Sequence, residues 1–223
     1  MDATAILFDW DGTLADSIGR LYEANVAVME AFGLPFDEAI YLRHASPDWR
    51  LMYARLGVPA DRIDEANERW LAAYHAGGST ELFDGARDAL VRLDGAGYRL
   101  GLVTAGHREV VAPLLAHHGL EAIFEVVVYG TDLVEQKPHP APLLHAIGRL
   151  DGVGPSDALY VGDTVEDMRM AAAAGVRSIG IPSLVGPAAA LLAAGAAETS
   201  PSVAAWTAGL LPDGPAGPAG PAR

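Results

Sequence analysis

The chain has 223 residues, of which 51% are hydrophobic, and its formal net charge is -14 at pH 7. This length suits one large domain, or a core domain with a small inserted one, and the acidic charge argues against nucleic acid or an anionic membrane as the main partner. The absence of cysteine excludes disulfides, thiolate nucleophiles and cysteine-ligated metals.

The N-terminus has no basic segment followed by an apolar run, so we expect no secretory signal. The longest apolar stretch near the C-terminus, residues 188–197, is too short to span a bilayer. We therefore expect a cytoplasmic protein without a membrane partner. The sequence does not indicate an oligomeric state.

Five short apolar runs lie along the chain, and most are continuous rather than alternating, as is typical of strands covered on both faces. Helical patterns follow these runs, which predicts an α/β fold: a Rossmann-like core with a parallel sheet and helices on both faces. The runs are Ala5–Phe8, Leu100–Val103, Glu125–Tyr129, Ala158–Val161 and Ser178–Ile181. The helical patterns cover residues 84–96, 108–118, 141–150 and 165–174.

The interval between the first two runs breaks this rhythm, because it is long, mostly helical in pattern and free of strand signals. It is too long for one crossover, so we expect an inserted all-helical cap domain at residues 16–81. The core would then comprise residues 1–15 and 82–200. The segment 201–223 is rich in Pro, Gly and Ala, and we expect it to be a disordered tail.

Two acidic residues directly follow the first run, in Asp9-Trp10-Asp11-Gly12-Thr13. Residues two apart on an extended segment point the same way, and ligands of open parallel sheets bind at the carboxyl ends of the strands. Asp9 and Asp11 are therefore expected to converge, one as a nucleophile toward phosphorus and the other as a proton donor and acceptor.

The ends of the next two strands carry a hydroxyl and a cation. Thr104 and the backbone N–H of Ala105 stand just before a helix, where they suit a phosphate oxygen. Lys137 is the one lysine beside fourteen arginines. Since arginine has replaced lysine almost everywhere else, Lys137 is expected to occupy a position where arginine cannot substitute, and it could neutralise a phosphate and the attacking carboxylate together.

The fourth strand ends in Gly162-Asp163-Thr164-Val165-Glu166-Asp167. Asp163 and Asp167 stand four apart at a helix start and could bind a hard divalent cation together with Asp9. Such a cation would also explain how an acidic protein binds an anionic substrate. Acids at a helix start are also explained by capping alone, so this signal is informative only together with the others.

In this order, the motifs around Asp9, Thr104, Lys137 and Asp163 resemble those of the haloacid dehalogenase-like hydrolase superfamily, and especially its phosphoglycolate phosphatase-like members. The resemblance implies a magnesium-dependent phosphatase of a small phosphorylated metabolite, with an aspartyl-phosphate intermediate and a helical cap. One departure is Ala105, where many relatives have Asn, so a side-chain hydrogen bond is lost while the backbone N–H remains.

The resemblance also implies a role for each residue. Asp9 would be the nucleophile and a Mg²⁺ ligand, and Asp11 the acid/base whose backbone carbonyl also binds the metal. Thr104 and Ala105 would bind the phosphoryl group, and Lys137 would orient and neutralise. Asp163 would ligate Mg²⁺, and Asp167 would do so directly or through water.

Other activities of the superfamily are separated by particular residues. Asp11 argues against dehalogenation, and the absence of lysine between residues 16 and 81 excludes phosphonate cleavage through a cap Schiff base. A sugar phosphomutase remains an alternative, and a non-catalytic binding protein on the same fold is a second one. Specificity is expected to come from the cap, with Arg43, His44 and Arg50 as candidates to contact a substrate anion or hydroxyl. The alternative for Arg43 and Arg50 is that they are solvated arginines on the cap helices.

Overall fold

Six parallel strands form one sheet in the computed structural model, which describes residues 3–212. The order β3-β2-β1-β4-β5-β6 places β1 between β2 and β4, so the chain changes direction across the sheet next to β1. In open α/β sheets such a switch point opens a crevice at the carboxyl ends of the strands. The strands are β1 (Ala5–Phe8), β2 (Arg99–Val103), β3 (Val126–Val128), β4 (Ala158–Gly162), β5 (Arg177–Gly180) and β6 (Glu198–Thr199).

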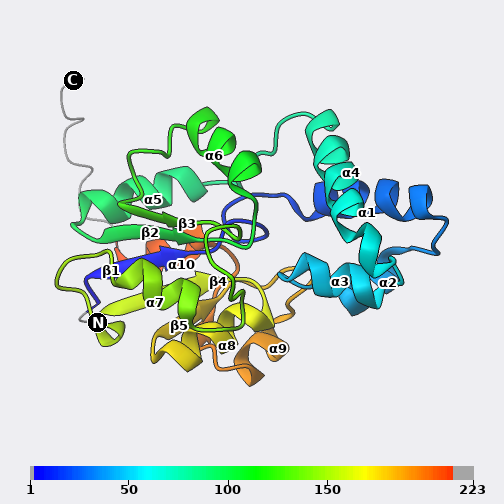
Figure 1. Ribbon diagram of the computed structural model, residues 1–223. Helices are drawn as coiled ribbons and strands as arrows, with labels where there is room; N and C mark the ends of the chain where they lie inside the picture. The colour runs from blue at the N-terminus through cyan, green and yellow to red at the C-terminus, as the bar shows by residue number, and fades with distance from the viewer. Residues whose placement is uncertain (1–2, 213–223) are drawn as a thin grey trace.

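Helices cover both faces of this sheet (Figure 1). Successive strand residues point to opposite sides, so the strands place apolar side chains on both faces, and helices bury them. Ile6 and Phe8 of β1 pack in one apolar cluster and Ala5 and Leu7 in another. The first cluster is completed by α5 (Ala86–Gly95), α6 (Arg108–His117) and α10 (Val203–Leu210). The second is completed by α7 (Ala141–Ile147) and α8 (Val165–Ala174), with α9 (Ala188–Ala193) packed beside α8. The expected parallel α/β core is confirmed.

Four helices lie together beyond the end of the sheet (Figure 1). Their inward side chains form an apolar cluster of their own, which includes Val28, Met29, Met52 and Tyr53. The helices are α1 (Ile18–Phe32), α2 (Glu38–His44), α3 (Trp49–Arg55) and α4 (Ile63–Ala76), with a short 3-10 turn at Ala60–Arg62 before α4.

The chain leaves the sheet for these helices and returns to it at one place. Ala15 and Leu82 form an antiparallel bridge. On either side of it, the N–H of Asp16 donates to the carbonyl of Glu81 at 2.9 Å, and the N–H of Phe83 donates to the carbonyl of Leu14 at 2.9 Å. The outgoing and returning segments are therefore hydrogen-bonded to each other.

The expectation of a disordered tail from residue 201 is wrong for its first part. Residues 203–210 form α10, capped by the Ser202 hydroxyl, which accepts from the N–H of Ala205 at 3.0 Å. Val203 and Trp206 lie three apart on one helix face and are buried against α5 and the sheet. The prediction relied on the high content of Pro, Gly and Ala in this segment and overlooked these two apolar residues. The rest of the expected tail, residues 213–223, lies outside the described residues.

Within residues 3–212, no helix is long and apolar enough to cross a membrane.

Replacing Trp206 by Ala tests whether α10 belongs to the folded core. Trp206 is 6% exposed, so Trp206→Ala should lower the free energy of unfolding by about 3–5 kcal/mol, measured by urea denaturation. Ala208→Ser, at an exposed position of the same helix, should change it by less than about 0.5 kcal/mol. Equal, small effects of both substitutions would contradict a packed α10.

Candidate active site

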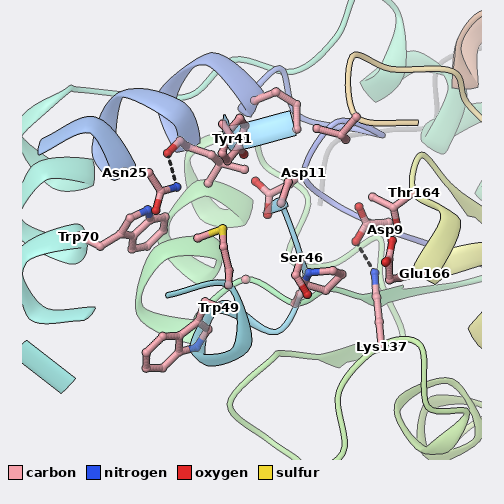
Figure 2. A pocket seen from close by; sticks show the side chains of 18 of the residues that line it. Asp9, Asp11, Asn25, Tyr41, Ser46, Trp49, Trp70, Lys137, Thr164 and Glu166 are labelled. Carbon is pink, nitrogen blue, oxygen red and sulfur yellow. Dashed lines mark hydrogen bonds and ion pairs between the residues drawn. The ribbon is translucent and has the colours of Figure 1, made fainter. Parts of the chain in front are cut away.

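The loop after β1 directs two carboxylates to one side and an indole to the other. Asp9 continues the strand, with its N–H donating to the carbonyl of Val161 at 2.8 Å. Asp9 and Asp11 both line a cavity of about 190 Å³, whereas Trp10 is fully buried in the core. The two acids therefore line the same cavity (Figure 2).

Gly12 allows this loop to pass close to the end of β4. Its φ of 78° lies in the left-handed region, and a Cβ at this position would lie 2.3 Å from Oδ2 of Asp163. No other residue type fits here without moving the Asp163 carboxylate.

Lys137 links the loop after β1 to the helix that follows β4. Its Nζ lies 2.5 Å from Oδ1 of Asp9 and 2.8 Å from Oδ1 of Asp167, and the side chain is 4% exposed. Burial alone lowers the pKa of Lys137, but the charges of Asp167 and Asp9 outweigh burial and raise that pKa above its usual value. Lys137 is therefore a permanent cation between two carboxylates.

Asp167 is fixed by contacts to both of its carboxylate oxygens. Oδ1 accepts from the Tyr160 hydroxyl at 3.0 Å as well as from Lys137. Oδ2 accepts from the backbone N–H and hydroxyl of Thr164, at 3.0 and 2.7 Å, in a capping box that begins α8. Gly162 leaves room for this carboxylate, because a Cβ there would lie 2.7 Å from it. The capping role considered for Asp167 is thus present alongside its ion pair.

Asp163 differs from Asp167 because one of its oxygens has no partner. Its side chain is fully buried, Oδ1 has only a long contact of 3.4 Å from the Thr13 hydroxyl, and Oδ2 has no hydrogen-bond partner. A buried carboxylate oxygen without a donor is costly unless a cation binds it.

The carboxylates of Asp9, Asp163 and Asp167 form a group that could hold a metal ion, since one oxygen of each lies within 4.8 Å of the others. Carboxylate oxygens are the ligands that hard divalent cations prefer, and the unpartnered oxygen of Asp163 supplies a free donor. The residues at this position therefore fit a divalent cation.

The burial of Asp9, Asp11 and Asp163 close to one another raises their pKa values. Burial raises the pKa of Asp9 to about 7, and the charges of Asp167 and Asp11 add to the rise while Lys137 opposes it. Burial also raises the pKa of Asp163 far above its usual value, with Asp9 and Asp167 contributing. The pKa of Asp11 is raised by burial and partly restored by the Ser17 hydroxyl and Lys137.

The loop after β2 forms the next wall of the site. The Thr104 hydroxyl accepts from the N–H of Gly106 at 2.9 Å, which leaves its own proton available to a ligand. Ala105 and Gly106 line the cavity, and a Cβ on Gly106 would lie 3.4 Å from Oδ2 of Asp11. The structure therefore brings Asp9, Asp11, Ala105, Lys137 and Asp167 to one cavity, whereas Thr104 and Asp163 are buried and do not line it.

The three cap residues expected to meet the substrate do not line this cavity. Arg43 is exposed at the end of α2, and His44 follows it. Arg50 is directed to the surface, where it pairs with Asp64 at 3.5 Å and stacks over the Trp49 ring at 4.1 Å. Arg43 and Arg50 were candidates because of their positive charge, but charge does not show which side of a helix faces a cavity.

Sequence reasoning missed the aromatic residues around the cavity. The His107 ring lies between the rings of Trp49 and Trp70, with centroid distances of 5.7 and 6.0 Å, and thus connects the loop after β2 to α3 and α4. Tyr160, which supports Asp167, was also missed, because a buried strand tyrosine gives no separate signal. Two tryptophans in a short helical insertion were the one available hint.

A parallel sheet that gathers carboxylates, a lysine and a hydroxyl at the ends of four strands defines a doubly wound α/β protein with its site at the switch point. The family model of the haloacid dehalogenase-like hydrolases matches residues 6–181. The chain belongs to this family, as the ordered motifs predicted, and it is therefore a hydrolase.

Relatives of known name extend the comparison. The phosphoglycolate phosphatase of Nitrosococcus oceani is 36% identical over 179 residues, covering 76% of this chain and 79% of its own. Among solved structures, a haloacid dehalogenase-like hydrolase from Bacteroides fragilis matches with a TM-score of 0.83 at 27% identity, over 91% of this chain and 98% of that one. CbbY from Rhodobacter sphaeroides, solved in complex with phosphate, matches with a TM-score of 0.76 at 29% identity, over 91% and 95%.

Gly186 offers a test of how closely the loops are packed around the acids. A Cβ at Gly186 would lie 1.8 Å from the backbone carbonyl oxygen of Asp163, which cannot move aside as a side chain can. Gly186→Ala should therefore lower the free energy of unfolding by about 1–3 kcal/mol in urea denaturation. Gly19→Ala, in α1 with no atom near the added Cβ, should instead raise it by about 0.5–1 kcal/mol. A neutral Gly186→Ala would show that the loop is free to shift.

Proposed function

We propose that this protein is a magnesium-dependent phosphatase of a small phosphomonoester, and that the phosphoryl group is transferred to Asp9 as a transient aspartyl-phosphate intermediate. The observation that supports this most directly is the ion pair of Lys137 with Asp9 and Asp167 at the base of the cavity, beside Asp11. The relatives named phosphoglycolate phosphatases support the same reaction class.

Asp9 is the proposed nucleophile. Lys137 engages its Oδ1 and favours the ionised carboxylate, which leaves Oδ2 to attack phosphorus. The bond from phosphorus to the leaving oxygen breaks as the bond to Asp9 forms, and Lys137 offsets part of the negative charge gathered there. The Thr104 hydroxyl and the N–H of Ala105 are proposed to hold the phosphoryl oxygens.

Asp11 is the proposed acid and base. Because burial raises its pKa, Asp11 can enter the reaction protonated and give its proton to the leaving alkoxide. The resulting carboxylate then takes a proton from the water that attacks phosphorus, which releases phosphate and regenerates Asp9.

Asp9 and Asp163, with the backbone carbonyl of Asp11, would hold Mg²⁺. Asp167 would act through water, because Lys137, Tyr160 and Thr164 already occupy its oxygens. When bound, Mg²⁺ would neutralise phosphate oxygens and the clustered carboxylates.

Residues 16–81 are proposed to form a cap that closes the cavity over the substrate. Their separate apolar cluster and the paired linkers at Ala15 and Leu82 support this division. The core would comprise residues 1–15 and 82–200, with α10 added to it.

Phosphate release from a panel of phosphomonoesters, with Mg²⁺ and with a chelator, tests this function. Asp9→Asn should reduce magnesium-dependent release by at least about 10³-fold, because a carboxamide cannot replace the attacking oxygen. Asp16→Asn, an exposed acid seven residues later, should leave release near the wild-type rate. Release that persists in Asp9→Asn would identify another nucleophile, and transfer of phosphate between sugar positions without release would favour the mutase.

Metal binding can be tested without turnover, through the melting temperature Tm. The folded pKa of Asp9, about 7, lies above its ordinary value of 3.8, so the metal-free protein loses stability as pH rises between these values. Mg²⁺ binds the deprotonated carboxylates and should offset this loss. We expect saturating Mg²⁺ to raise Tm by on the order of 5 °C at pH 8 and far less at pH 5.

Asp163→Asn is the control for this measurement, because it removes the unpartnered carboxylate and should abolish most of the shift at pH 8. An equal shift at both pH values, or a shift that survives in Asp163→Asn, would argue against a carboxylate metal site here.

A further inference from the structure

The cavity extends well beyond the reacting groups. Its volume is about 190 Å³ and its lining includes residues of all four helices of the insertion, so the space holds a leaving group as well as a phosphate. Figure 2 shows Asp9 and Lys137 at one end and Trp49 and Trp70 at the other. The far end is therefore the compartment in which the leaving group would lie.

Apolar and aromatic side chains from the helical insertion dominate this far end. They come mainly from α1, α3 and α4, and the main ones are Leu21, Trp49, Met52, Tyr53 and Trp70. Tyr41 of α2 also lines the cavity but lies nearer the acids, beside Asp11 (Figure 2). Such a lining favours a leaving group with a hydrophobic body, since its burial removes apolar surface from water.

The lining contains almost no positive charge. Of the described residues that line the cavity, only Lys137 carries a permanent positive charge, and Asp9 and Asp167 already neutralise it. Glu166 and Asp11 add further carboxylates. Burial lowers the pKa of His107, so the imidazole stays neutral at ordinary pH. An anionic leaving group would enter an acidic, partly desolvated space without a counter-charge.

The nearby arginines do not line the cavity. Arg50 lies 3.5 Å from the exposed Asp64 and stacks over the Trp49 ring, and its charge reaches His107 of the lining, whose pKa it helps to lower. Arg20 donates to the carbonyls of Ser79 and Tyr74. Arg43 is exposed and does not line the cavity.

One fully buried polar atom without a hydrogen-bond partner belongs to a lining residue, Asn25, and it is an acceptor. Asn25 lines the cavity and is 3% exposed; its Nδ2 donates to the carbonyl of Leu21 at 2.7 Å, whereas its Oδ1 has no hydrogen-bond partner. An amide oxygen attracts a hydroxyl or N–H and repels a carboxylate.

We infer that the substrate is the phosphomonoester of an uncharged alcohol with a hydrophobic, ring-sized body, and that esters with a carboxylate in the leaving group, including phosphoglycolate, are poor substrates. This inference rests on the proposed phosphatase function. It separates this chain from the relatives whose names specify phosphoglycolate.

Three phosphomonoesters test the inference with wild-type protein and Mg²⁺. Benzyl phosphate and para-carboxybenzyl phosphate differ by one remote carboxylate and share a similar leaving oxygen, and phosphoglycolate is the third. We expect kcat/KM for benzyl phosphate to exceed that for each carboxylate by at least about tenfold. A higher kcat/KM for phosphoglycolate than for benzyl phosphate would overturn the inference and leave the phosphatase function intact.

A matched pair of variants tests the cause. Leu42 lines the cavity and is 38% exposed, so Leu42→Arg adds a cation there without filling the core. It should raise kcat/KM for para-carboxybenzyl phosphate relative to benzyl phosphate by about tenfold or more. Leu51→Arg, 42% exposed and outside the lining, should leave the ratio unchanged. An unchanged ratio in Leu42→Arg, or equal changes in both variants, would contradict the role of missing charge.

Arg43→Ala tests the exposed arginine that follows Leu42 of the lining. It should leave activity on all three esters near wild type, and a selective loss on phosphoglycolate would show that Arg43 supplies the counter-charge and would overturn the inference. Absence of magnesium-dependent release from every ester would instead contradict the proposed function, and the inference with it.

Discussion

The site depends on burying three carboxylates beside a single ammonium group. Asp9 and Asp163 follow two neighbouring strands and Asp167 stands in the first turn of α8, and all three are buried where water cannot separate their charges. Lys137 makes this arrangement tolerable by pairing with two of them, and Tyr160 and Thr164 satisfy what remains of Asp167. Asp163 is left under-neutralised, which is the condition under which a divalent cation binds strongly and a phosphate can approach an acidic site.

The cavity joins two regions with different chemistry. The sheet contributes charges and hydrogen-bonding groups, held on strand ends and on loops whose glycines contact neighbouring backbone, such as Gly130 against the carbonyl of Ala105. The helical insertion contributes mostly apolar and aromatic surface. Phosphoryl chemistry needs fixed charges, whereas selection among alcohols needs shape and the absence of wrong charges, so the two tasks fall to different segments.

Much of this could be predicted from the sequence, for an identifiable reason. In a parallel sheet the residue just after each strand comes to one edge, so Asp9, Thr104 and Asp163 were predictable as neighbours from the sequence alone. Lys137 stands further along the loop after β3, and its being the one lysine among many arginines marked it. The cavity lining was not predictable. Helical spacing in the insertion shows that Trp49 and Trp70 have a buried face, but not whether that face meets other helices or an open space.

Composition was misleading at one place, and charge left another place open. Arg43 and Arg50 were candidates for substrate contact because of their charge; neither lines the cavity, and Arg50 lies 3.5 Å from Asp64. Two buried residues of α10, Val203 and Trp206, outweigh a surrounding composition that is typical of disordered chains. Local packing decides such cases, and average composition cannot report it.

The hydrogen-bonded pair of linkers at Ala15 and Leu82 has an evolutionary consequence. The chain leaves the sheet at Ala15 and returns to it at Leu82, so the segment between these residues is inserted without interrupting any strand of the sheet. Mutations can accumulate in this insertion, or the whole insertion can be replaced, while the register of β1 with its neighbours stays intact. New substrates can in this way be acquired through changes in the insertion while the catalytic residues at the strand ends keep their positions.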